Sequence, residues 1–156
     1  MESLPSQCTI VKEIRFDDLK TFWIDNDHFE NPLTKRYPLL IKQLGVHKCT
    51  YENPAYKCYG LFYEDKYGEL MIGGTMLTQW QPNRIRYRTL HIVKEHRGND
   101  LGWHLLETAW NMHWKGMGHL WGHIKDTHYR WALSHGFWET DTRWTDEHIG
   151  MYKVMD

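Results

Sequence analysis

Hydrophobic and polar positions alternate in several segments of the chain. CTIVKEIRF, Cys8 to Phe16, has a period of two and predicts a first strand with one buried face. YKCYGLFYE, GELMIGGTMLTQW and NRIRYRTLHIV, between residues 56 and 93, predict three consecutive strands, and EDKYG joins the first two as a hairpin. Three shorter strands are predicted further on, at GHLWGHI, FWETDT and IGMYKVMD.

Other segments have the spacing and end signals of helices. DDLKTFWIDNDHF begins with the acidic residues that a helix N-terminus prefers, and PLLIKQLG is a short helix closed by Gly45. DTHYRWALSHG predicts a helix with Asp126 or Thr127 as its N-cap and Gly136 just after its end. A longer helix ends near Trp114 and has one apolar face, formed by Leu101, Leu105, Leu106, Ala109 and Met112.

The order of these elements is β-α-α-β-β-β-α-β-α-β-β. It predicts a mixed α/β sheet flanked by helices, with RTLHIV in a central strand. The chain has 156 residues and no internal repeat, low-complexity tract or linker-like run. Residues 1–156 are therefore predicted to form a single domain.

Composition excludes several classes of function. The formal net charge of -1 gives no general attraction to nucleic acid or to anionic lipid, so any anion site must be local. No window approaches the roughly 18 apolar residues of a membrane span, and MESLPSQCTI has no signal-peptide pattern. Three cysteines without a CxxC pair predict reduced thiols. We therefore expect a cytoplasmic protein.

The stretch LHIVKEHRGNDLGWHLL passes from a strand into a helix through charged residues and glycines. Such a turn leaves the first helix amides without intrahelical partners, at the positive end of the helix dipole. Gly98 and Gly102 permit close backbone approach, and Arg97 adds a fixed charge. The pattern is that of an anion cradle, although a plain turn with a solvated arginine has the same spacing.

This stretch resembles the acetyl-CoA-binding motif of the GNAT superfamily of N-acetyltransferases. The family signature is (Arg/Gln)-x-x-Gly-x-(Gly/Ala) between its fourth strand and third helix, and here it reads RGNDLG, with Asp100 in place of the middle glycine. YGELMIGGTMLTQW, LSHGF and IGMYKVM resemble the family's third strand, fourth helix and last strand. The resemblance implies a mostly antiparallel GNAT acyl-CoA N-acyltransferase fold.

By this resemblance, the protein uses acetyl-CoA as its co-substrate and needs no metal. The strand edge would hydrogen-bond the pantetheine arm, which would lie where TLHIV and HLWGHI diverge. An ionised Asp100 close to a diphosphate would cost binding energy unless it points away. The implied cofactor-binding residues are His91, Ile92, Val93, Arg97, Gly98, Asn99, Asp100, Leu101 and Gly102.

The family's usual acid and base do not match this chain. A Glu of the fourth strand would fall at or near Arg88, and a Tyr of the fourth helix at Ala132. Tyr129 and His128 share a helical face with Ala132, and we favour Tyr129 as general acid because a phenol is neutral before it donates. For the base we favour His91, with Glu95 second. Catalysis by positioning and a backbone amide would need no single essential side chain.

Arg84, Arg86 and Arg88 recur with a period of two and share one face of their strand. A solvated strand end has this pattern. The alternative is an acceptor with a carboxylate or phosphate, bound by Arg86 and Arg88. Replacing both arginines by Gln would then raise the acceptor KM without changing CoA affinity.

The function predicted is acetyl transfer from acetyl-CoA to a primary amine, by direct attack in a ternary complex. The acceptor and the choice between monomer and homodimer stay open. A non-catalytic ligand-binding or interaction domain of the same fold is one alternative. A metal module is another, built on His119 and His123 with three further candidate ligands, His47, Cys49 and Cys58. Histidines four apart on a strand are poorly placed to chelate one ion.

Overall fold

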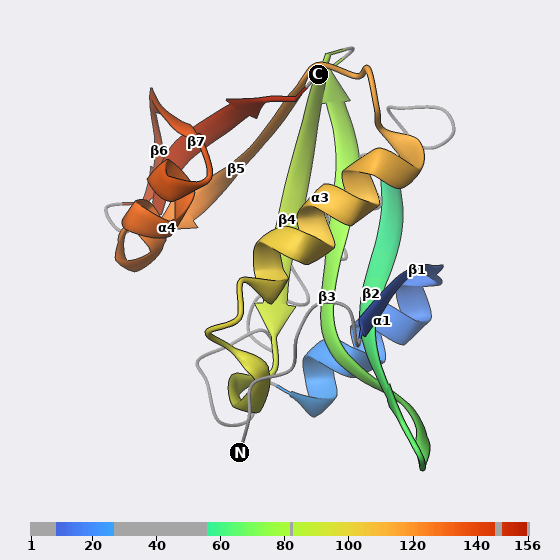
Figure 1. Cartoon of the computed structure of the whole chain (residues 1–156). Helices are drawn as coiled ribbons and strands as arrows, with labels where there is room; N and C mark the ends of the chain where they lie inside the picture. Colours follow the sequence, from blue (N-terminus) through green and yellow to red (C-terminus); the bar gives the residue numbers. More distant parts are fainter. Residues whose placement is uncertain (1–8, 27–55, 82, 146–147, 156) are drawn as a thin grey trace.

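A computed structural model describes residues 9–26, 56–81, 83–145 and 148–155 of the chain. A seven-stranded sheet runs through them in the order β1-β2-β3-β4-β5-β7-β6 (Figure 1). The strands are β1 (Thr9–Ile14), β2 (Tyr56–Asp65), β3 (Gly68–Gln81), β4 (Arg84–Ile92), β5 (His119–Lys125), β6 (Trp138–Thr145) and β7 (His148–Val154). The helices are α1 (Phe16–Asp25), α3 (Leu101–His113) and α4 (Tyr129–Ser134), with short 3₁₀ turns η2 (Lys94–His96) and η3 (Asp126–His128).

All strand pairs in this sheet are antiparallel except β4 and β5, which are parallel. The mixed, mostly antiparallel sheet predicted from the sequence is therefore confirmed. Strand β4 is the fourth of seven, so the prediction that RTLHIV is central is also confirmed. The predicted helix PLLIKQLG lies outside the described residues.

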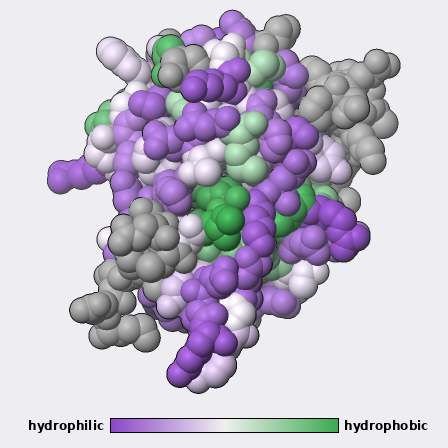
Figure 2. Space-filling view, turned by 45° about the vertical axis from the view of Figure 1, so that its right-hand side comes forward, coloured by the Kyte–Doolittle hydropathy of each residue, from purple (hydrophilic) through white to green (hydrophobic). Residues whose placement is uncertain are grey.

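Helices cover the two faces of the sheet separately. A large core lies on the face that α3 covers, and it takes in side chains of both α3 and α4. A smaller core lies under α1 on the other face, formed by Leu19, Phe22, Trp23, Cys58 and Met76. On the side of the molecule shown in Figure 2, hydrophilic residues predominate and hydrophobic residues reach the surface in small groups. In the described residues, no helix is long and apolar enough to cross a membrane.

Helix α3 buries most of its predicted face. Leu101, Leu105, Leu106 and Ala109 are buried, but Met112 is 42% exposed and Trp110 is fully buried. The prediction was therefore wrong for Met112, and it left out Trp110. The last turn of α3 lies at the β1 edge of the sheet, where His113 Nε2 is 3.5 Å from a carboxylate oxygen of Glu13. Little sheet remains there for Met112 to cover.

Helix α4 is shorter than its sequence pattern suggests. Asp126 and Thr127 belong to the 3₁₀ turn η3, so neither is the N-cap. The N-cap is His128, which makes no capping hydrogen bond with its side chain. The predicted stop is confirmed, because Gly136 follows the C-cap His135 with φ +83°.

Candidate functional site

The site is built around the point where β4 and β5 part. These two strands pair only at their beginnings, over Arg84–Arg86 and His119–Trp121, and then diverge (Figure 1). The ring of Tyr87 lies at this branch point, against Gly122 of β5. Beyond Arg86, the edge of β4 that faces β5 has no strand partner among the described residues. Backbone groups of an unpaired edge are free to bind an extended ligand.

A β-bulge in β4 lies just beyond the branch point. His91 pairs with Gly74 and Arg88 pairs with Met76, so Thr89 and Leu90 together oppose Thr75. A bulge leaves one residue out of the ladder and turns the strand locally. This bulge was not predicted from the sequence. The glycine pair Gly73–Gly74 was an available signal, since glycine within a strand often marks a bulge or a close approach.

The predicted glycine turn leads from η2 into α3. Gly98 has φ +96° and Asp100 has φ 60°, ψ 24°, both in the left-handed region. Helix α3 starts at Leu101, and His104 donates its amide to the Asp100 carbonyl at 3.1 Å. The amides before His104 therefore lie ahead of the helical ladder. A Cβ on Gly98 would meet nothing within 4 Å, so the turn is open at this residue.

The remaining residues of the turn are placed as follows. Leu101 buries its side chain in the core, while Asn99 is half-buried. Gly102 lies over β4, where an added Cβ would be 3.4 Å from Leu90 Cδ2. The Arg97 side chain folds back, and its Nε donates to the Ile92 carbonyl at 2.8 Å.

Val93 differs from its neighbours on the predicted pantetheine edge. Its amide donates to the Ile72 carbonyl at 2.8 Å, and its own carbonyl accepts a bond from the amide of His96. Both backbone groups of Val93 are therefore engaged within the protein. Since alternate amides of a strand point to the same edge, the His91 amide is directed at β3 like that of Val93, and the prediction of edge hydrogen bonds rests on the backbone of Ile92, together with the bulge nearby.

Asp100, where the sequence departs from the signature, is bound by another side chain. His135 Nε2 lies 2.8 Å from Asp100 Oδ1. The His135 ring stacks on Trp103, with 4.9 Å between ring centroids and 23° between ring planes. The carboxylate is therefore directed at the end of α4.

The candidate acids lie near α4. The Tyr129 hydroxyl donates to a Glu139 carboxylate oxygen at 3.1 Å. This hydrogen bond and the charge of Glu139 raise the pKa of Tyr129 above its ordinary value. His128 is exposed and belongs to η3, whereas Ala132 is fully buried in the core. Tyr129 and His128 thus start from different elements, one at the first residue of α4 and one before it.

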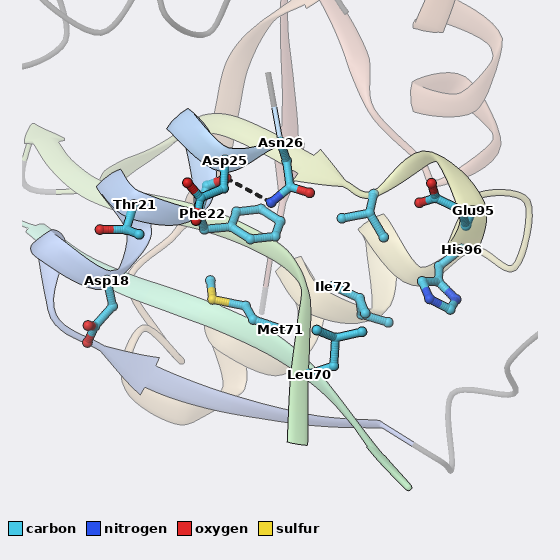
Figure 3. A pocket seen from close by; sticks show the side chains of 11 residues that line it. Asp18, Thr21, Phe22, Asp25, Asn26, Leu70, Met71, Ile72, Glu95 and His96 are labelled. Carbon is cyan, nitrogen blue, oxygen red and sulfur yellow. Dashed lines mark hydrogen bonds between the residues drawn. The ribbon is translucent and has the colours of Figure 1, made fainter. Parts of the chain in front are cut away.

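The candidate bases lie toward α1. The His91 ring meets Phe22 edge to face, with 5.8 Å between centroids. Phe22 in turn forms part of a cavity of about 540 Å³ (Figure 3). Glu95 stands exposed at one end of this cavity, beside His96. His91 and Glu95 are therefore on the α1 face of the sheet, opposite the face that α3 covers.

The cavity combines an apolar floor with acidic walls. Phe22, Leu70, Met71, Ile72 and Val93 supply the apolar surface. Asp18 and Asp25 of α1 and Glu95 of η2 supply three carboxylates, and among the described residues neither Lys nor Arg lines the cavity. In Figure 3, Asp18 and Glu95 stand at opposite ends. The cavity therefore has the chemistry to hold a cation with an apolar stem.

Arg86 does not line this cavity. Its guanidinium carbon lies 5.1 Å from the centre of the Trp121 ring, at the β4–β5 pairing. Burial lowers the pKa of Arg86 to about 10. The register places Arg86 opposite Thr78, on the face of the sheet that α1 covers. The Arg88 backbone pairs with Met76, and the Arg88 side chain is outside the described part.

The metal alternative gains no support from the residues that the structure describes. Among them, no three His, Cys, Asp or Glu side chains are grouped as metal ligands. His119 Nδ1 lies 3.3 Å from the Asn83 carbonyl, and Cys58 is buried under α1. His47, Cys49 and the His123 side chain lie outside the described part.

Comparison with solved structures identifies the arrangement. An acetyltransferase of the GNAT family from Staphylococcus aureus superposes with a TM-score of 0.65 at 14% identity, covering 95% of this chain and 99% of the other. The PaiA N-acetyltransferase of Thermoplasma acidophilum, in complex with coenzyme A, gives 0.63 at 16% identity, with 94% and 98% covered. The chain has the GNAT fold.

A third GNAT-fold neighbour is the spermidine N-acetyltransferase of Vibrio cholerae, solved in complex with CoA and spermine. Its TM-score is 0.62 at 15% identity, with 96% of both chains covered. No family model and no curated protein matches the sequence. The GNAT fold is therefore recognised in three dimensions, at sequence identities of 14% to 16% with these structures.

Proposed function

We propose that the protein transfers an acetyl group from acetyl-CoA to a primary amine. The observation that carries the proposal is the conjunction of the unpaired, bulged β4 edge with the open turn at Gly98 and the start of α3. The edge can bind an amide-containing arm in the manner of an added strand. The amides ahead of the helical ladder can bind a diphosphate. Two of the fold neighbours were solved with CoA.

The cofactor would lie with its diphosphate at the amides of Gly98 to Gly102 and its pantetheine arm along β4. This places the thioester near the bulge at Thr89 and Leu90, where a backbone amide outside the ladder can polarise its carbonyl. The amine nitrogen attacks the carbonyl carbon of the thioester. The C–N bond then forms and the C–S bond breaks. No covalent enzyme intermediate is needed, since both substrates are bound together.

Three proton transfers accompany this reaction. The ammonium of the acceptor must lose one proton before attack, and His91 or Glu95 on the α1 face would accept it. The departing thiolate must gain one, which Tyr129 would donate, and the second proton lost by the nitrogen as the amide forms would restore the Tyr129 phenol. The Tyr129 hydroxyl donates to Glu139 with 3.1 Å between the two oxygens, and Glu139 raises the pKa of Tyr129, so the phenol stays neutral until the thiolate forms.

The acceptor would enter on the α1 face through the acidic cavity. Three carboxylates and an apolar floor favour a cationic amine over an anionic one. The spermine bound in a fold neighbour has this chemistry. Arg86, the basis for an anionic acceptor, instead lies over Trp121 and away from the cavity lining.

The first test is calorimetric titration of the purified protein with acetyl-CoA, with dephospho-CoA as a control ligand. Gly102 supplies a matched pair of variants. Gly102→Ala adds a Cβ in ordinary contact with Leu90, so we expect binding within about twofold of the original. Gly102→Leu extends a side chain beside the helix amides and should weaken binding about tenfold or more.

Turnover is then measured by release of free thiol in the presence of an amine. Putrescine and γ-aminobutyrate have the same chain length, but one ends in an ammonium and the other in a carboxylate. We expect a lower KM for putrescine, and Asp25→Asn should raise that KM while Glu107→Gln, on exposed α3 surface, leaves it unchanged. A lower KM for γ-aminobutyrate would restore the anionic acceptor predicted from Arg86 and Arg88.

The alternative is a GNAT-fold domain that binds a ligand or partner without catalysis. It predicts no thiol release with any amine. If the folded protein shows no binding of acetyl-CoA up to millimolar concentration, the acetyltransferase proposal fails and this alternative replaces it.

A further inference from the structure

Asp100 occupies the turn that binds the diphosphate in the proposed function. We propose that His135 is a positioning residue for this turn: it holds the Asp100 carboxylate at the end of α4 and so keeps the negative charge off the bound diphosphate. The inference rests on the acetyl-CoA-binding function proposed above. The geometry behind it is the 2.8 Å contact between His135 Nε2 and Asp100 Oδ1.

The backbone explains why Asp100 is tolerated in the turn. Its φ of 60° and ψ of 24° lie in the left-handed region, which glycine adopts freely and which Asp and Asn adopt more readily than other residues. The turn therefore keeps its shape without glycine at this position. What changes is the charge, because a carboxylate one residue before α3 opposes an anion at the same helix end.

The surroundings of His135 fix its ring in place. Trp103 of α3 stacks on one side at 4.9 Å between centroids, and Trp131 of α4 lies at 5.2 Å with 59° between ring planes. The His135 side chain is 15% exposed, whereas the Asp100 side chain is 56% exposed. The histidine is therefore the more enclosed partner, and it determines where the more exposed carboxylate lies.

A cation lies close to this group. Lys153 Nζ of β7 stands over the Trp103 ring, 5.5 Å from its centroid. The Trp103 ring thus stacks with the His135 ring and also lies under the Lys153 ammonium. Together these residues make the end of α4 a favourable place for the carboxylate, and the amides at the start of α3 are left to the diphosphate.

The test is a double-mutant cycle read by calorimetry, with CoA and with pantetheine, which lacks the phosphates. His135→Phe keeps an aromatic ring between the two tryptophans and removes the donor to Asp100. We expect it to weaken CoA binding about three- to tenfold and to leave pantetheine binding unchanged. His135→Gln, which retains a donor, should restore most of the CoA affinity.

Asp100→Gly supplies the second side of the cycle. In this background there is no carboxylate to hold, so His135→Phe should change the CoA affinity by less than about twofold. An equal effect of His135→Phe with and without Asp100, or an equal effect on pantetheine, would overturn the positioning role. Tight CoA binding by Asp100→Gly with none by the original protein would overturn it as well, since the carboxylate would then not be held away. Failure of every folded variant to bind CoA would instead remove the proposed function, and this inference with it.

Discussion

The ring of Tyr87 on β4 lies directly against Gly122 on β5. A Cβ added to Gly122 would be 2.8 Å from Tyr87 Cε1 and 3.0 Å from its Cζ, too close for the ring to stay where it is. Tyr87 therefore occupies the branch point at which the two parallel strands separate, and the absence of a side chain on Gly122 makes room for it.

Gly122→Ala is therefore expected to destabilise the protein. The Tyr87 ring would have to move within a packed core, which costs about 1–3 kcal/mol of unfolding free energy. Urea denaturation measures this loss. Gly102→Ala is the matched control, because its Cβ finds ordinary contact at 3.4 Å and alanine is the better helix former. Equal stability of Gly122→Ala and the original protein would show that the Tyr87 ring can move to another position without loss of unfolding free energy.

Tyr59 links β2 to the end of α3 through its buried hydroxyl. Trp114 Nε1 donates to this oxygen at 2.7 Å, and His113 Nδ1 lies 2.9 Å from it. Tyr59→Phe leaves a buried indole N–H without its acceptor, so we expect a loss of about 1–3 kcal/mol in thermal or urea unfolding. Tyr63→Phe, at a half-buried ring on the same strand, should cost less than about 0.5 kcal/mol. Similar losses in both variants would contradict a specific role for the Tyr59 hydroxyl.

The buried thiol of Cys58 makes the free energy of unfolding depend on pH in the alkaline range. Burial raises the pKa of its thiol from 9.0 to about 12, because the thiolate is disfavoured in the core under α1. The neutral thiol's contribution to stability is thus complete below pH 9.0 and is lost as the pH rises through about 12. Burial raises the pKa of Tyr59 and Tyr87 as well, so they act in the same direction.

We therefore expect the urea midpoint to fall between about pH 8 and about pH 11, and to fall less in Cys58→Ala than in the original protein. The variants are best made without Cys8 and Cys49, so that the remaining thiol is Cys58. Its reaction with a thiol reagent should then be slow in the folded protein and fast in urea. Rapid reaction in the folded state would show that the thiol is accessible.

The order of strands and the center of the sheet could be predicted because hydrophobic periodicity is local. The hairpin at EDKYG fixes the register of its neighbours, whereas CTIVKEIRF predicts a strand without its buried face, since Val11 is buried and Ile10 is 47% exposed. The helix faces were harder to predict, since burial depends on what lies opposite. Met112 follows the apolar period and still reaches solvent at the edge of the sheet, whereas the large Trp110 is enclosed.

The candidate site was predictable only in its backbone. Gly98 identifies the turn from sequence, because few other residues adopt its positive φ. The partner of Asp100 could not be found this way, since His135 is 35 residues away and meets it only in the folded chain. The same holds for the acidic cavity, whose walls come from α1 and η2. Side chains from distant segments converge through tertiary packing, which a single sequence does not display.

The hydrogen bond from the Tyr129 hydroxyl to Glu139 allows the role of Tyr129 as general acid to be tested. A general acid works only while protonated, so the rate should fall as the pH rises through the pKa of Tyr129. Glu139 raises that pKa above the ordinary 10.0, and the carboxylate is the cause. Glu139→Gln should therefore lower the pKa of Tyr129 and move the alkaline limb of kcat to lower pH. Tyr129→Phe should lower kcat and abolish the limb.

The measurement is thiol release with saturating acetyl-CoA and one fixed amine, from about pH 8 to about pH 10.5, corrected for uncatalysed hydrolysis. Glu107→Gln is the control, because it makes the same substitution on the exposed surface of α3. It should leave the limb in place. Superimposable limbs in Glu139→Gln and the original protein would mean that the proton on the departing thiol comes from another group. Solvent or the second substrate would then be its source, and positioning alone would account for the rate.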